Sequence, residues 1–215
     1  MVRDFTLETY EKLCTAILSN NFLPISVSDY IESGTSSKKI AIMRHDVDAK
    51  PKNALKIAEI ESKLGIRSTY YFRTVKKVRN EGVMMAINNL GHEIGYHYEV
   101  LALSNGNKEK AIKLFENELS NLRDIANIRT ICMHGSPLSK WKDSDLWLDY
   151  NFKDYGIIGE AFLSLEYDKI HYYTDTGGKW NANNSNIRDK VKTNLDSKPA
   201  KSTFDLIGLL PSLNV

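Results

Sequence analysis

The chain has 215 residues, of which 42% are hydrophobic and 26% are charged, and its formal net charge at pH 7 is +2. This composition is typical of a globular protein, and one domain spanning residues 1–215 accounts for the length. The small net charge does not favour a nucleic-acid partner, and no apolar run reaches the roughly 18 residues of a membrane span. The first residues lack the apolar segment of a secretory signal and two cysteines make no disulfide framework, so we expect a cytoplasmic protein.

Taken in chain order, the hydrophobic pattern alternates between helical and extended spacing. Amphipathic spacing predicts helices, which are expected over residues 6–20, 27–31, 51–64, 80–90 and 108–126. Short apolar or aromatic runs predict strands, which are expected over residues 40–43, 66–72, 92–97 and 129–133. A polar connector is expected over residues 34–39. This alternation predicts an α/β fold with a parallel sheet and right-handed crossovers, either open or closed into a barrel.

Beyond Gly135 the pattern is weaker. We expect one strand around residues 157–158 and another over 170–174, then a polar loop over 176–186 and a last helix over 203–210. No internal repeat and no low-complexity linker interrupts the chain, so no domain boundary is placed.

Polar side chains stand at the ends of four successive predicted strands. Asp46 and Asp48 follow the first strand, Arg73 ends the second, His97 the third and His134 the fourth. The carboxyl ends of parallel strands meet at one edge, where α/β proteins collect their chemistry. Imidazole and carboxylate ligands suit a zinc-like divalent ion with one position open for water, whose pKa falls toward about 7. A second carboxylate can take the proton. Arg73 is the other predicted catalytic residue, and it is expected to pair with Asp46 or to bind a helix end.

Each of these residues also has a purely structural interpretation. Asp46 and Asp48 suit a solvated loop or the cap of the following helix. His97 suits a hydrogen-bonded core position, and His134 suits a turn. His45 alternates with Asp46 along the strand and so points to the other face, which excludes it from the predicted metal site. The order of the motifs favours the functional interpretation of the others.

Three strings in this region resemble a known family. They are His-Asp-Val-Asp at 45–48, Ser-Thr-Tyr-Tyr-Phe-Arg at 68–73 and Gly-His-Glu-Ile-Gly-Tyr-His-Tyr-Glu at 91–99. In this order they resemble the polysaccharide deacetylase family, also called NodB-like or carbohydrate esterase family four. A weaker echo follows at 173–177.

The resemblance implies a distorted or incomplete (β/α) barrel and a metal-dependent hydrolase. Such an enzyme removes an acetyl group from an N-acetylated sugar or polysaccharide precursor, and zinc is the expected metal. The resemblance makes Asp46 the catalytic base, with Asp48 and His97 as metal ligands. A carbohydrate is then the expected substrate. Tyr98 and Trp180 are expected to stack on a sugar face, with Asp175 near the rim of the site.

Two positions depart from the family pattern. Where the family has a second metal-binding histidine four residues after His97, this chain has Leu101, so His134 is the preferred third ligand and Glu99 the alternative. The family's late histidine on a final strand has no counterpart before Val215, which leaves open a truncated chain or altered or absent catalysis. Two other functions therefore stay open: a catalytically inactive carbohydrate-binding member of the same fold, and a hydrolase of a non-sugar amide.

Overall fold

The computed structural model describes residues 3–33, 39–136, 138–175, 178, 180, 191, 193, 195 and 198–213. Most of the polar connector expected over 34–39 and most of the polar loop expected over 176–186 lie outside the described residues. Among the helices that the structure describes, none combines the length and the apolar content needed to cross a membrane.

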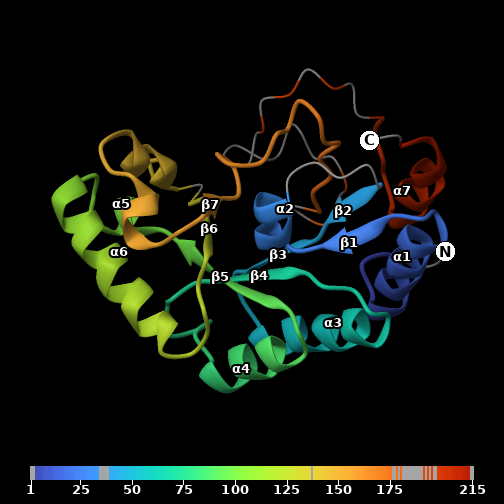
Figure 1. The fold of residues 1–215 in the computed structure, drawn as a ribbon, viewed down its shortest axis with the longest axis horizontal. Coiled ribbons are helices and arrows are strands. Elements are labelled where there is room, and N and C mark those ends of the chain that lie inside the picture. Colours follow the sequence, from blue (N-terminus) through green and yellow to red (C-terminus); the bar gives the residue numbers. More distant parts are fainter. Residues whose placement is uncertain are drawn as a thin grey trace.

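A five-stranded parallel sheet forms the centre of the fold (Figure 1). Its strands follow one another in chain order: β3 (Arg44–Val47), β4 (Thr69–Phe72), β5 (Glu93–Tyr98), β6 (Thr130–Met133) and β7 (Gly159–Glu160). A separate parallel pair joins β1 (Leu23–Ile25) to β2 (Ile40–Ile42). The expected α/β class and parallel sheet are confirmed, and closure into a barrel stays a prediction.

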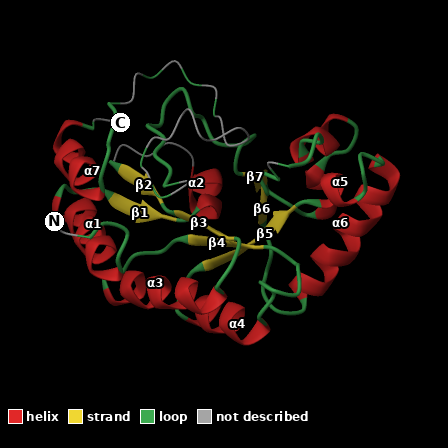
Figure 2. Cartoon of the chain, turned by 180° about the vertical axis from the view of Figure 1, so that it is seen from behind, coloured by secondary structure: helices red, strands yellow, loops and turns green. Residues whose placement is uncertain are grey.

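Helices surround the sheet on both faces and at both ends (Figures 1 and 2). They are α1 (Leu7–Ser19), α2 (Val27–Ser33), α3 (Pro51–Lys63), α4 (Glu81–Asn89), α5 (Val100–Leu103), α6 (Lys108–Arg123) and α7 (Thr203–Leu209). Three short 3₁₀ turns complete the described elements: η1 (Asp143–Leu148), η2 (Phe152–Tyr155) and η3 (Leu210–Ser212). Helices α3 and α4 run beneath the sheet, α5 and α6 lie near β5 and β6, and α1 packs beside α7 next to β1 and β2.

The helix ends follow from local side chains. The hydroxyl of Thr6 and the amide oxygens of Asn80 and Asn107 accept hydrogen bonds from the first free N–H groups of α1, α4 and α6. Pro51 opens α3, where its missing N–H costs nothing. Ser202 and its partner three residues on form a capping box at α7. The helices expected at these places are confirmed, apart from shifts of a few residues at their ends.

The central strands are buried on both faces, and their polar side chains, such as those of Thr69, Glu93 and Thr130, are buried with the apolar ones. All residues of β4, β5 and β6 are buried, as expected of a parallel sheet covered on both sides. Gly95 is required within β5, because a Cβ there would lie 2.3 Å from the ring of Tyr71 on β4. A smaller apolar cluster joins α1 to α7 away from the sheet.

Two expectations for the last third of the chain are corrected. The strand expected around 157–158 is β7, at Gly159–Glu160. Residues 170–174, all of which are described, form no strand. All five line a cavity instead.

Candidate metal centre

Three of the predicted metal ligands meet at the carboxyl ends of their strands. Asp48 follows β3, His97 lies near the end of β5, and His134 directly follows β6. The Oδ1 atom of Asp48 lies 3.0 Å from Nδ1 of His134 and 3.4 Å from Nε2 of His97, and the two nitrogens lie 3.3 Å apart. The three donor atoms therefore form a nearly equilateral triangle.

The size of this triangle fits a tetrahedral metal site. Zinc bonds of about 2.0–2.1 Å place tetrahedral donors roughly 3.3–3.4 Å apart, which is close to the separations found here. Two imidazoles and one carboxylate are also a donor set that divalent zinc accepts, and three ligands leave a fourth position for water or substrate. The residues present fit the metal that the sequence predicts.

Backbone contacts orient both histidines. The Nδ1 atom of His97 lies 2.9 Å from the carbonyl oxygen of Cys132, which can only accept, so Nδ1 carries the proton and donates it. In the neutral tautomer the Nε2 atom of His97 therefore carries a lone pair that faces Asp48 and His134. The backbone N–H of His134 donates to the carbonyl of Tyr98 at 2.7 Å, which extends the β5–β6 pairing and fixes the position of His134.

The site favours a positive charge at its centre. Burial by itself would raise the pKa of the Asp48 carboxyl, but hydrogen bonds and charge from His134 and His97 hold that pKa well below its usual range. Burial would lower the pKa of His97, yet the charges of Asp46 and Asp48 raise it. The carboxylates therefore stabilise a cation beside His97, whether a proton or a metal ion.

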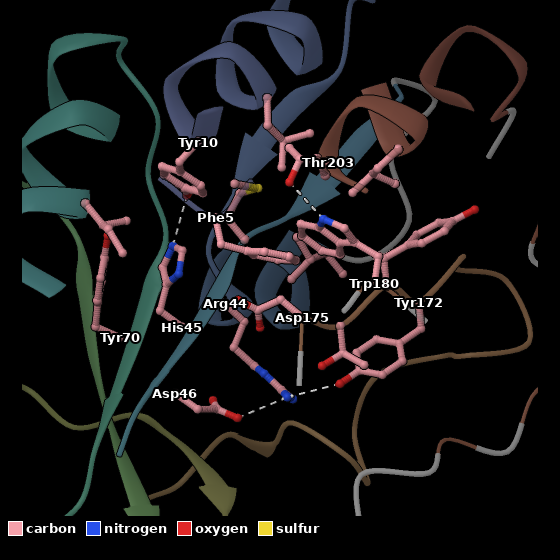
Figure 3. Close-up of a pocket in the computed structure, with 18 of the residues that line it drawn as sticks. Phe5, Tyr10, Arg44, His45, Asp46, Tyr70, Tyr172, Asp175, Trp180 and Thr203 are labelled. Carbon is pink, nitrogen blue, oxygen red and sulfur yellow. Dashed lines mark hydrogen bonds and ion pairs between the residues drawn. The ribbon is translucent and has the colours of Figure 1, made fainter. Parts of the chain in front are cut away.

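Asp46 lies at the edge of the triangle, on the same face of the strand as Asp48. Its carboxylate and a donor atom of His97 are within 4.8 Å, and Sγ of Cys132 lies 4.0 Å from its Oδ2 atom. The guanidinium of Arg44 donates to the same carboxylate at 3.2 Å and to the hydroxyl of Tyr172 at 3.3 Å (Figure 3). Asp46 is thus an ion-paired carboxylate next to the predicted metal.

The expected pairing of Arg73 with Asp46 is wrong. The guanidinium of Arg73 donates three hydrogen bonds of 2.8–2.9 Å to the carboxylate of Glu99. Glu99 precedes α5, so this pair ties the end of β4 to the turn after β5. Because Glu99 is held by this cation and lies outside the donor triangle, it is not the third ligand of the cluster. Leu101 is 2% exposed and belongs to the core.

The expectation that Tyr98 stacks on a sugar is also wrong. Its side chain is fully buried in the core, and its hydroxyl accepts from Nε1 of Trp147 at 2.8 Å and donates to Glu160 at 3.4 Å. Neighbouring residues of a strand point to opposite faces, so Tyr98 cannot share the site of His97.

A cavity of about 1280 Å³ opens from the metal centre. Asp46, Asp48, His97 and His134 line one part of it, and the wall continues along the preceding strand residues to α1 and α7. Asp175 and Trp180 both line this cavity, as the predicted substrate contacts should, and Figure 3 shows both side chains among its walls. The indole of Trp180 donates to the hydroxyl of Thr203 at 2.9 Å.

Several residues of the site escaped the sequence analysis. Arg44 stands two positions before Asp46 and was available as its partner, since both lie on one strand face. Cys132 alternates with His134 in the same way and forms a second donor group with Asp46 and His97. His171 and Tyr172 line the cavity from the segment that was expected to form a strand, and that expectation did not point to the site.

Behind β3, on the face away from Asp46, lies a buried carboxylate. Glu61 of α3 is fully buried and accepts hydrogen bonds from the hydroxyls of Tyr10 and Tyr70 and, at 2.8 Å, from Nε2 of His45. Burial would raise the pKa of this carboxyl, but the charge and hydrogen bond of His45 and the two hydroxyls lower it to about 2. His45 is thus outside the metal centre, as the sequence predicted, and ties β3 to α1 and α3.

Comparisons of the chain with models of protein families, with curated proteins and with solved structures find no match. The functional argument therefore depends on the motifs and on the geometry of the site.

Proposed function

We propose that this chain is a metal-dependent hydrolase that removes an acetyl group from an N-acetylated sugar or polysaccharide precursor. The observation that carries the proposal is the triangle of Asp48, His97 and His134, with the ion-paired carboxylate of Asp46 beside it and a large cavity in front. The order of the motifs, which resembles that of polysaccharide deacetylases, gives the same assignment for Asp46, Asp48 and His97. His134 stands in for the family's second histidine, whose position is Leu101 in this chain.

In this proposal Asp48, His97 and His134 hold the divalent ion, most simply zinc. When bound, such an ion acts as a Lewis acid that polarises the substrate carbonyl and makes water a better nucleophile near neutral pH. Asp46 accepts the proton of the attacking water and later returns it to the leaving amine. Arg44 orients Asp46 through their ion pair. Trp180 and Asp175 contact the sugar.

Metal content tests the ligands. We expect about one zinc ion per chain in the purified protein and a large loss of zinc in Asp48→Ala and His97→Ala. His171→Ala is the matched control, because it removes an imidazole from the same cavity wall without touching the donor triangle, and it should retain zinc. A wild-type chain that binds no divalent metal after dialysis against zinc would contradict the proposal.

Acetate release tests the chemistry. The zinc-loaded protein should release acetate from N-acetylglucosamine oligomers. Asp46→Asn should retain the metal and lose on the order of 10²-fold or more in rate, as expected for a missing general base. Zinc binding without acetate release from any N-acetylated sugar would leave the inactive carbohydrate-binding function in its place.

A further inference from the structure

The cavity extends well beyond the space that an acetyl group needs. Residues 40–48 all line it in succession, from β2 through Met43 to the end of β3. A strand rises about 3.3 Å per residue, so this wall runs for up to roughly 25 Å from the metal centre. The volume of about 1280 Å³ also exceeds the roughly 300–1,000 Å³ of most small-molecule pockets.

The two ends of the cavity differ in chemistry. The end near Asp48 carries the metal ligands, Arg44 and Asp46. The far end is apolar, and its walls come from α1, β2 and the C-terminal helical turns, with side chains of Leu13, Ile17, Phe22, Ala41, Leu206 and Leu210. Four of these, Leu13, Ile17, Leu206 and Leu210, are only 4–6% exposed, so they form the packed base of the far end. Ala41 and Met43 are only partly buried and leave surface open to the cavity.

Aromatic side chains stand between the two ends. Phe5 and Trp180 stack with ring centroids 5.9 Å apart, and Figure 3 shows the pair between Arg44 and Thr203. Met43 and Tyr173 also pack against the apolar cluster and line the cavity. Polar groups that fix one end of a ligand and apolar walls that bury the rest are the usual construction of a site for an amphipathic molecule.

We propose that the apolar end of the cavity binds an apolar chain of the substrate, so that the substrate of this hydrolase is an amphipathic N-acylated sugar. This inference rests on the proposed function. The chain has two possible sources, an acyl group longer than acetyl on the nitrogen or a lipid-like group on the sugar. Each buried methylene favours binding roughly fourfold, so several methylenes dominate the affinity.

The binding test uses calorimetry on the zinc-loaded Asp46→Asn variant, which holds substrate without rapid turnover. One series of probes is N-acetyl-, N-butyryl- and N-octanoylglucosamine, and the other is the methyl, butyl and octyl glycosides of N-acetylglucosamine, all below their micellar concentrations. We expect the octyl or octanoyl member of one series to bind at least tenfold more tightly than its shortest member. The series that gains affinity identifies the source of the chain.

The gain in affinity with chain length should disappear when a larger side chain fills the apolar end. Ala41→Phe places a large ring in that wall, far along the strand from Asp46. We expect this variant to lose the preference for long chains, while a wild-type zinc content and a cooperative urea transition show that it is folded. Met43→Phe serves as a second variant if Ala41→Phe does not fold.

The outcomes separate this inference from the proposed function. Turnover of N-acetylated sugars without any gain in affinity along either series would overturn the apolar-chain site and leave the hydrolase intact. Chain-dependent binding that Ala41→Phe removes, without turnover by the wild type, would support the apolar-chain site and overturn the hydrolase. Chain-dependent binding that neither variant weakens would place the chain elsewhere and overturn the site proposed here.

Discussion

Replacement of Glu61 by glutamine should destabilise the protein strongly although the change lies away from the metal centre. The side chain of Glu61 is fully buried and accepts from His45, Tyr10 and Tyr70. Glutamine preserves the shape but removes the negative charge that balances His45. It also brings an amide NH₂ to a place where the surrounding groups are donors. Glutamine keeps only one acceptor oxygen, so at least one of the imidazole and the two hydroxyls loses its acceptor.

The magnitude follows from the pKa of the carboxyl. It falls from an ordinary value of 4.5 to about 2 in the folded protein, which corresponds to about 3 kcal/mol of stability at neutral pH. Loss of one partner of a buried ion pair costs a similar amount, about 3–5 kcal/mol. Because the pKa is lower in the folded state, this stabilisation is complete above about pH 4.5 and is lost as the pH falls through about 2.

Urea unfolding at pH 7 and at pH 3 measures both effects. At pH 7 the midpoint of Glu61→Gln should fall by roughly 1 M or more, and at pH 3 its difference from wild type should shrink to about half or less. Glu59→Gln is the matched control, since it makes the same change on the exposed face of α3. A difference from wild type below about 1 kcal/mol at pH 7, or one that is equal at pH 7 and pH 3, would refute the reasoning.

Three further predictions concern the site and its support. Arg44→Met should lower acetate release by about ten- to a hundredfold with zinc content unchanged, because Arg44 positions Asp46; equal activity in the variant would remove this role. Gly95→Ala should lower the free energy of unfolding in urea by about 1–3 kcal/mol, because its Cβ would meet the Tyr71 ring at 2.3 Å. An unchanged midpoint would show that the ring can move freely. Tyr98→Phe should lower the free energy of unfolding by about 1 kcal/mol, because the hydrogen bonds of its hydroxyl are lost. The affinity of this variant for sugars should stay at the wild-type value. A weaker affinity would restore Tyr98 to the substrate site.

The amino-acid sequence by itself determined the elements and the central part of the site. Helix caps and apolar spacing are local properties, so the helices at α1, α3, α4 and α6 could be predicted. The positions of Asp48, His97 and His134 at strand ends were equally predictable, because parallel strands bring their carboxyl ends to one edge. The alternation of side chains along a strand also separated His45 from Asp46 correctly. Applied to His97 and Tyr98, the same alternation excludes Tyr98 from the site of His97.

Only the tertiary structure decided which groups meet across long distances in the chain. Both Arg44 and Arg73 lie near the edge of the sheet, but the partner of each depends on how neighbouring strands and turns pack, and no local pattern contains that information. The same holds for residues 170–174, which line the cavity and form no strand although their sequence favours one. The apolar end of the cavity exists because α1 packs beside α7, almost two hundred residues later in the chain. Side-chain spacing is set locally, whereas the shape of a cavity is set by packing between distant segments.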